Sequence, residues 1–328
     1  MKLRTLGRTG QRVSEIGFGA WAIGGTWGEV SMEDAKAALN AALDAGMTFI
    51  DTADVYGDGR SEKIIAEVLN QRGGERPFVA TKLGRRLSPH VAEGYNAENL
   101  NAFIDRSREN LQTDTLDLVQ LHCPPIEVYY NPDVFAVMDE MVAAGKIRHY
   151  GVSVEKVEEG LKALEFPNVS SIQLIYNIFR QRPAELLLRE AKRRDVAIIA
   201  RVPLASGLLT GKMRADSVFA ADDHRTFNRN GEAFDKGETF SGVPYEVALE
   251  AVEEIRRFVT GDTTMAMFAL RWILMNEDVS VVIPGAKNRE QAEANARASD
   301  VDALSADTMA ALKQIYQEKI APHVHQRW

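Results

Sequence analysis

Residues 32–51 have the sequence MEDAKAALNAALDAGMTFID, in which a helix pattern passes directly into a strand pattern. Apolar residues at positions 35, 38, 39, 42 and 45 recur with the period of one helix face, which predicts a helix over Met32–Ala45. The short apolar run that follows predicts a strand at Thr48–Asp51. The unit is then repeated, with a helix predicted at Ser61–Asn70 and a strand at Phe78–Lys82. Such alternation is typical of a parallel α/β sheet.

The alternation continues along the chain and predicts eight strands. The other six are Ser14–Phe18, Leu116–His122, His149–Ser153, Ser171–Tyr176, Ala197–Arg201 and Ser280–Ile283. The other predicted helices of these units are Ala97–Leu111, Asp133–Ala144, Val157–Glu165, Ala184–Arg194, Tyr245–Phe258 and Arg289–Ala298. Eight β-α units in a row favour an α/β fold of the (β/α)8 TIM barrel type over an open, doubly wound sheet, which has fewer strands and a switch point.

Four segments outside these units predict additions to the barrel. Residues 2–13 predict an N-terminal β-hairpin around a glycine-containing turn, placed to cover one end of the barrel. Thr264–Met275 and Ser305–Lys319 predict extra helices in the C-terminal part of the chain. The long polar stretch Ala205–Gly242 predicts a mobile loop over a site. The sequence shows no domain boundary, so residues 1–328 are expected to form a single domain.

Composition excludes several classes of partner. The net charge of -8 argues against nucleic acid, whose phosphates require a basic field. The longest apolar stretch, Met265–Leu270, is too short to span a membrane, and Met1–Gly10 lacks the apolar region of a signal peptide. Cys123 is the single cysteine, which suits a reducing compartment. We therefore expect a cytoplasmic protein.

Polar side chains end three of the predicted strands. Asp51, Lys82 and His122 stand at strand ends, and Tyr56 follows Asp51 by five residues. In a barrel the carboxyl ends of the strands form one mouth, so these four side chains are expected to converge there. An acid, a phenol, an ammonium group and an imidazole make a proton-donating set.

This set suits the reduction of a carbonyl group. A free tyrosine, with a pKa near 10, is a weak acid at neutral pH. An ammonium group about 4 Å away, at an effective dielectric constant near 20, favours the phenolate by roughly 4 kcal/mol, or about three pKa units. We therefore expect Lys82 to lower the pKa of Tyr56 and Asp51 to keep Lys82 charged. His122 is expected to hydrogen-bond the substrate oxygen.

The chain also resembles the aldo-keto reductases, including bacterial members, in a series of motifs. These are FIDTADVYG at residues 49–57, GRSE at 59–62, TK at 81–82, LH at 121–122, GVS at 151–153, PL at 203–204, GLLTGK at 207–212 and IPG at 283–285. They occur in the family's order as far as about residue 300. The resemblance implies a barrel fold, a catalytic tetrad of Asp51, Tyr56, Lys82 and His122 with Tyr56 as proton donor, and NADPH bound extended without a Rossmann fold.

The resemblance also implies a set of cofactor-binding residues. They are Gly19, Ala20 and Trp21 at the nicotinamide ribose, Ser153 and Gln173 at the carboxamide, Arg201 at the nicotinamide ring, Pro203, Leu204, Gly207, Leu208, Thr210 and Lys212 over the pyrophosphate, and Gly285, Lys287, Arg289, Gln291 and Asn295 at the adenosine 2′-phosphate. Arg201 stands where many members have an aromatic residue, and Gln291 where the best-known branch has arginine. Trp21 and Trp27 either pack within their loop or, with Tyr56 and His122, line the substrate pocket.

Three functions are compatible with this sequence. The first is an NADPH-dependent oxidoreductase for a small carbonyl compound. The second is a cofactor-binding redox sensor or regulatory subunit, because the resemblance extends to potassium-channel β subunits that keep the tetrad. The third is metal-dependent hydrolysis in a barrel, but no strand carries an H-x-H pair, so no metal site is predicted. The sequence indicates neither the substrate nor an oligomeric state.

Overall fold

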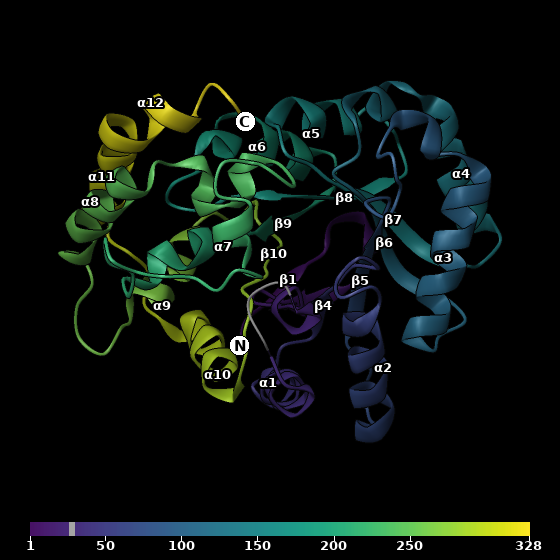
Figure 1. Cartoon of the computed structure of the whole chain (residues 1–328), viewed down its shortest axis with the longest axis horizontal. Coiled ribbons are helices and arrows are strands. Elements are labelled where there is room, and N and C mark those ends of the chain that lie inside the picture. The colour runs from purple at the N-terminus through teal and green to yellow at the C-terminus, as the bar shows by residue number, and fades with distance from the viewer. Residues whose placement is uncertain (26–29) are drawn as a thin grey trace.

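Eight parallel strands, hydrogen-bonded in chain order, form the centre of the computed structural model, which describes residues 1–25 and 30–328 (Figure 1). The strands are β3 (Phe18–Gly19), β4 (Phe49–Asp51), β5 (Phe78–Leu83), β6 (Leu116–His122), β7 (Ile147–Ser153), β8 (Val169–Ile175), β9 (Ala197–Arg201) and β10 (Val281–Val282). Each strand pairs in parallel with its neighbour in sequence.

The first and last strands meet and close the sheet into a barrel. Parallel bridges join Ile16 to Val282 and Gly19 to Gly285. The amide of Gly19 donates to the carbonyl oxygen of Pro284 at 3.0 Å. A Cβ atom on Gly19 would lie 2.6 Å from the carbonyl oxygen of Ile283, so this close approach requires glycine. The prediction of a (β/α)8 barrel is confirmed.

Helices surround the barrel (Figure 1). They are α1 (Met32–Asp44), α2 (Arg60–Arg72), α3 (Ala97–Leu111), α4 (Pro132–Ala143), α5 (Val157–Ala163), α6 (Leu187–Arg193), α8 (Tyr245–Arg256), α9 (Met265–Leu274), α10 (Arg289–Arg297), α11 (Ala306–Ile315) and α12 (Ala321–Val324). Side-chain caps fix several starts, as where Ser31 accepts from the amide of Asp34. No helix in the described ranges is long and apolar enough to cross a membrane.

Two predicted helices are interrupted. The helix predicted at Ala184–Arg194 is a 3₁₀ turn at Arg182–Glu185 followed by α6, because Leu186 between them has a non-helical backbone with φ of −142°. The helix predicted at Ser305–Lys319 is α11 followed by a π-helical turn at Tyr316–Ile320.

The N-terminal hairpin fills one end of the barrel. Its strands are β1 (Leu3–Thr5) and β2 (Arg12–Ser14), paired antiparallel. The predicted first barrel strand, Ser14–Phe18, therefore began too early, because Ser14 pairs with Leu3 in the hairpin. Leu6 and Val13 pack in a core with Phe49, Ala80, Leu118, Ala197, Ile199, Val281 and Ile283 of the barrel. We call Leu6, Val13 and the turn between them the hairpin plug.

The stretch predicted as a long loop is folded onto the barrel. Residues 205–242 contain 3₁₀ turns at Ala205–Thr210, Lys236–Glu238 and Phe240–Gly242, and the short helix α7 (His224–Phe227). The hydroxyl of Ser206 donates to the carbonyl oxygen of Glu238 and accepts from the amide of Phe240, both at 3.1 Å. The two ends of this stretch are thereby tied together. Its mobility stays a prediction.

Candidate active site

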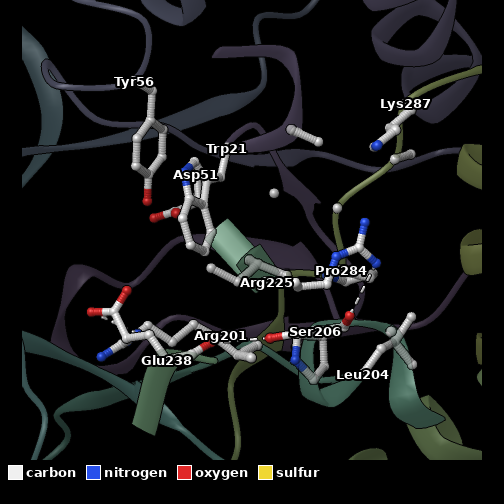
Figure 2. Close-up of a pocket in the computed structure, with 18 of the residues that line it drawn as sticks. Trp21, Asp51, Tyr56, Arg201, Leu204, Ser206, Arg225, Glu238, Pro284 and Lys287 are labelled. Carbon is white, nitrogen blue, oxygen red and sulfur yellow. Dashed lines mark hydrogen bonds and ion pairs between the residues drawn. The ribbon is translucent and has the colours of Figure 1, made fainter. Parts of the chain in front are cut away.

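A cavity of about 1060 Å³ lies where the carboxyl ends of the barrel strands meet (Figure 2). Its lining includes Asp51, His122, Gln173 and Arg201, each from the last part of a different strand. Such a cavity, at the carboxyl ends of the strands, is where barrel enzymes carry their active sites.

Lys82 joins two of the predicted tetrad residues. Its Nζ atom donates to Asp51 Oδ1 at 2.6 Å, to the carbonyl oxygen of Thr52 at 2.9 Å and to Tyr56 Oη at 3.1 Å. The adjacent strands β4 and β5 place Asp51 beside Ala80, two residues before Lys82. The three predicted residues are therefore brought together by neighbouring strands and the turn that follows β4.

A tight turn sets the position of Tyr56. Its amide donates to the carbonyl oxygen of Ala53 at 3.1 Å. Gly57 follows with φ of 61°, and a Cβ atom there would lie 2.2 Å from the carbonyl oxygen of Gly24. Only glycine fits at this point, so the turn is pressed against the loop after β3 and the tyrosine faces the cavity.

The protonation of the pair follows from burial and charge. Burial alone would lower the pKa of Lys82, but the Asp51 carboxylate and Tyr56 outweigh it and raise that pKa. Burial also raises the pKa of the Tyr56 phenol above its ordinary value, and the Lys82 ammonium opposes this rise without cancelling it. The expected net lowering by Lys82 is therefore not what the structure shows. Lys82 is charged and Tyr56 is protonated at neutral pH.

His122, at the end of β6, completes the predicted tetrad. Its ring meets Tyr56 edge to face, with the ring centroids 5.9 Å apart. Burial holds the pKa of His122 well below its ordinary value, and the positive charges of Arg85 and Lys82 lower it further. Within the described part of the chain, Nδ1 of His122 is buried without a hydrogen-bond partner. A neutral imidazole facing the cavity can donate one hydrogen bond to a ligand oxygen.

Asp51 also connects this group to Gln173 on β8. Gln173 Nε2 donates to Asp51 Oδ2 at 2.7 Å, while Oδ1 binds Lys82. Ser153 pairs with Gln173 in the sheet, but it is fully buried, with its hydroxyl oxygen 3.5 Å from the sulfur of Cys123. Cys123 itself lines the cavity.

The cavity wall contains most of the predicted cofactor residues. These are Gly19, Trp21, Gln173, Arg201, Pro203, Leu204, Gly207, Thr210, Lys212, Gly285, Lys287, Gln291 and Asn295. Among the described residues, Ala20, Ser153 and Leu208 are buried behind the wall, and Arg289 lies outside it. Trp27 falls at a position outside the described residues. The roles of all these residues remain predictions.

The end of the cavity far from Tyr56 lies at the start of α10, beside Lys287 (Figure 2). Asn288 caps this helix by accepting from the amide of Gln291 at 3.0 Å, and Gln291 accepts from the amide of Lys287 at 2.9 Å. Arg289 instead forms an ion pair with Glu293, at 3.5 Å. The positive end of the helix dipole and a nearby lysine favour a phosphate group.

These features fit an extended dinucleotide. Lys212 and Lys287 both line the cavity, and Gly207, with φ of 98°, forms part of its wall. Side chains other than glycine rarely adopt this backbone conformation, so this part of the cavity wall requires glycine. The volume also leaves room for a small second ligand beside Tyr56.

A charged group lies in the cavity wall, which we call the ion cluster: Arg85, Glu155, Arg201 and Glu238. The sequence analysis named only Arg201 among them, as a cofactor residue, and missed the other three. Arg85 Nη2 binds Glu155 Oε1 at 2.9 Å and Glu238 Oε1 at 2.5 Å. Arg201 Nη2 binds Glu155 Oε2 at 2.8 Å, and its Nη1 lies 3.5 Å from Glu238 Oε1. Arg85 and Glu155 each follow a strand end within two residues, so the rule that selected the tetrad could have found them. Glu238 carries no such signal.

Charge is distributed unequally within the ion cluster. Although burial opposes it, Arg85 and Arg201 hold the pKa of Glu238 well below its usual range. Burial raises the pKa of Glu155, and Glu238 adds to this rise although Arg201 opposes it. Ligand atoms of Cys123, Glu155 and Glu238 lie within 4.8 Å of one another. However, guanidinium groups already bind both carboxyl groups, and burial raises the pKa of the thiol to about 12, so this group suits a metal cation poorly.

Known proteins of one family match nearly the whole chain. The aldo/keto reductase family model matches residues 15–317. The chain is 32% identical over 307 residues to aldo-keto reductase YhdN of Bacillus subtilis, covering 90% of this chain and 87% of that protein. It is 29% identical to the Schizosaccharomyces pombe aldo-keto reductase yakc [NADP(+)], covering 86% of this chain and 83% of that protein. The solved structure of glycerol dehydrogenase AKR11B4 from Gluconobacter oxydans matches with a TM-score of 0.76 and 28% identity, covering 96% of this chain and 93% of that one.

Proposed function

The chain belongs to the aldo/keto reductase family, and from this premise we propose that it reduces an aldehyde or ketone to an alcohol, with NADPH as hydride donor and Tyr56 as proton donor. Members of this family are NAD(P)H-dependent oxidoreductases of carbonyl compounds. One observation carries the assignment of Tyr56: its side chain lines the cavity with the hydroxyl oxygen 3.1 Å from the buried Nζ atom of Lys82.

Each tetrad residue has a distinct part in the proposed reaction. NADPH, when bound, supplies a hydride to the carbonyl carbon of the substrate. Tyr56 donates its hydroxyl proton to the carbonyl oxygen, and Lys82 stabilises the phenolate that is left. Asp51 holds Lys82 in place through the 2.6 Å ion pair. Neutral His122 donates a hydrogen bond that orients the carbonyl oxygen, and a proton from solvent then restores Tyr56.

The cofactor assignment rests on the shape and charge of the cavity. We assign the 2′-phosphate to the start of α10 and to Lys287, because both border the cavity end opposite Tyr56. Arg289 contributes less, since it pairs with Glu293 outside the cavity wall. The name of the yakc relative, which specifies NADP(+), supports the same choice.

The variant Tyr56→Phe tests the proposal. Loss of the general acid is expected to lower kcat by about 10²–10⁴-fold. The NADPH dissociation constant, measured by fluorescence titration, is expected to stay the same, because the lost hydroxyl bonds to Lys82 and not to the cofactor. Tyr150→Phe is the control: its hydroxyl binds Asp139 at 2.8 Å, away from the cavity, and full activity is expected.

Two outcomes would contradict the proposal. A Tyr56→Phe protein that keeps more than about a tenth of kcat would show that another group supplies the proton. A wild-type protein that binds NADPH tightly but oxidises it with no member of an aldehyde and ketone panel would instead support the regulatory function.

A further inference from the structure

Asp54 is a buried acid in the turn that carries Tyr56. It precedes Tyr56 by two residues, and its side chain is fully buried. Its amide donates to the carbonyl oxygen of Lys82 at 3.1 Å, so its backbone joins the turn to the strand that carries the lysine. In the described part of the chain, neither carboxyl oxygen of Asp54 has a hydrogen-bond partner. An ionised carboxyl group is unfavourable in such a place, because no donor replaces the hydrogen bonds of water.

Charged groups reach Asp54 from three elements of the fold. Burial is the largest effect and, with the carboxylate of Glu62 on α2, raises the pKa of Asp54 to about 7. Arg86, in the loop after β5, and Arg106, on α3, oppose this rise. The amide of Val55 opposes it less, since it does not reach hydrogen-bond geometry with the carboxyl group. Asp54 is therefore protonated below neutral pH and ionised above it.

The other neighbours of Asp54 offer it no positive charge. Glu62 is buried and accepts hydrogen bonds from Thr81 at 2.6 Å and from Asn110 at 2.8 Å. Tyr95 lies just before α3, and burial raises the pKa of its phenol, with a smaller contribution from Asp54. Both neighbours thus disfavour a carboxylate beside them. An ionised Asp54 can be stabilised only by the arginine side chains.

Arg106 connects the surroundings of Asp54 to the far end of the turn. Arg106 Nη2 donates to the carbonyl oxygen of Asp58 at 2.9 Å and to Asp58 Oδ1 at 2.8 Å, and Arg86 pairs with the same carboxylate. Arg106 Nη1 is buried, and within residues 1–25 and 30–328 it has no hydrogen-bond partner. An ionised Asp54 is expected to attract this guanidinium group and to weaken its bonds to Asp58. Asp58 follows Tyr56 by two residues, so the turn would lose a contact that fixes it.

On the basis of the function proposed above, we propose that Asp54 is a positioning residue for Tyr56 that acts in its protonated form, so that carbonyl reduction slows as pH rises through neutrality. The protonated side chain is neutral and leaves Arg106 bound to Asp58. Loss of the proton draws Arg106 away and shifts the Tyr56 hydroxyl relative to Lys82, which lies 3.1 Å from it. Proton delivery to the substrate is then less well aligned. This effect is separate from the loss at more alkaline pH, where Tyr56 itself is ionised.

The first test is the pH dependence of hydride transfer. With an aldehyde that the wild-type protein reduces, the single-turnover rate of NADPH oxidation is expected to fall by about tenfold between about pH 6 and pH 8, with a midpoint near 7. Asp54→Asn keeps the shape and neutrality of the protonated residue, so its rate is expected to stay constant over this range. Asp44→Asn is the matched control: it removes an exposed carboxylate that pairs with Arg72 and is expected to follow the wild type.

Two further measurements do not depend on turnover. In protein labelled with carbon-13 aspartate, the infrared C=O band of a protonated aspartic acid is expected to disappear as pH rises through about 7, and to be absent from Asp54→Asn. Amide hydrogen exchange in residues 54–62 reports on the turn. At the higher pH the wild type is expected to exchange faster there than Asp54→Asn, and at the lower pH the two proteins are expected to exchange alike.

The results separate positioning from a purely structural role. A band that does not titrate near neutral pH would overturn the proposal. So would a wild-type rate that stays constant while the band titrates, or an Asp54→Asn rate that falls with pH as the wild-type rate does. If Asp54→Asn does not fold, the wild type still decides: coinciding midpoints of band and rate support the proposal, and different midpoints refute it. If no carbonyl compound is reduced, the proposed function fails, whereas the band and the hydrogen exchange still test the effect of Asp54 on the turn.

Discussion

Replacing Lys82 by methionine tests the electrostatic coupling on which the proposed chemistry depends. The Lys82 ammonium lies 3.1 Å from the phenol oxygen of Tyr56 and is buried. At an effective dielectric constant near 20, a charge pair at this distance attracts by about 5 kcal/mol, which corresponds to about four pKa units for the phenol. The structure shows that burial already raises the pKa of Tyr56 against this attraction. Without the ammonium, the pKa of Tyr56 therefore rises further.

The sign of the pH effect follows from the direction of the reaction. Reduction uses the protonated phenol, so activity is lost as pH rises through the pKa of Tyr56. In Lys82→Met the loss of activity at alkaline pH moves to higher pH. At lower pH, where Tyr56 is protonated, the rate of reduction falls because the phenol is a weaker acid. We expect kcat to fall by about 10²–10⁴-fold. Single-turnover reduction of an aldehyde that the wild-type protein reduces, followed by NADPH absorbance across a range of pH, measures both effects.

The same change leaves the Asp51 carboxylate buried without its cation. Such a loss costs about 3–5 kcal/mol of folding free energy, so urea unfolding must accompany the kinetics. The double variant Asp51→Asn/Lys82→Met removes the uncompensated charge, and Gln173 Nε2 can still donate to the new amide oxygen. It is expected to fold more stably than Lys82→Met and to remain equally slow. A folded Lys82→Met protein with substantial activity and an unchanged alkaline limb would refute the coupling.

Two further predictions concern the cofactor and the outer contacts of the cavity wall. We expect NADPH to bind at least about tenfold more tightly than NADH. Lys287→Ala is expected to remove more of this preference than Arg289→Ala, because Arg289 pairs with Glu293. Equal losses of the preference in titrations of the two variants with both cofactors would contradict the assignment. We expect Trp328→Phe to lower the free energy of unfolding by about 1–2 kcal/mol by losing the bond to Asp235, and Trp328→Ala by about 3–5 kcal/mol by leaving a cavity. Equal losses in urea unfolding would show that packing of the Trp328 ring on Gly237 and Gly242 contributes little.

The barrel and the grouping of the tetrad could be predicted because both follow from local patterns. Each strand carries its own apolar run, and the carboxyl ends of parallel strands meet at one mouth. Asp51, Lys82 and His122 stand at or near the ends of their strands, so their places in the sequence predict that they lie together at the mouth of the barrel. The start of the first barrel strand could not be predicted as well, because the same alternation runs from the hairpin strand at Ser14 into the barrel.

Other features depend on contacts that no local pattern records. Glu238 is separated from Arg85 by 153 positions and lies in a polar stretch without periodicity. Arg289 points away from the cavity and pairs with Glu293, because the Asn288 cap fixes where α10 begins and so which residues of its first turn face the cavity. The raised pKa of Tyr56 required knowledge of burial: a sequence shows that a lysine is near, but not how little water remains around the phenol.

The hairpin plug gives the two ends of the barrel different roles in engineering this protein. Leu6 and Val13 are buried at the end opposite the cavity, and Gly7 between them fits so closely that a Cβ atom would lie 2.5 Å from the backbone nitrogen of Ala197. None of these three residues lines the cavity. Directed evolution could therefore raise thermal tolerance around the plug first and diversify the cavity mouth afterwards, using the added stability to accept substitutions there that are costly to the fold.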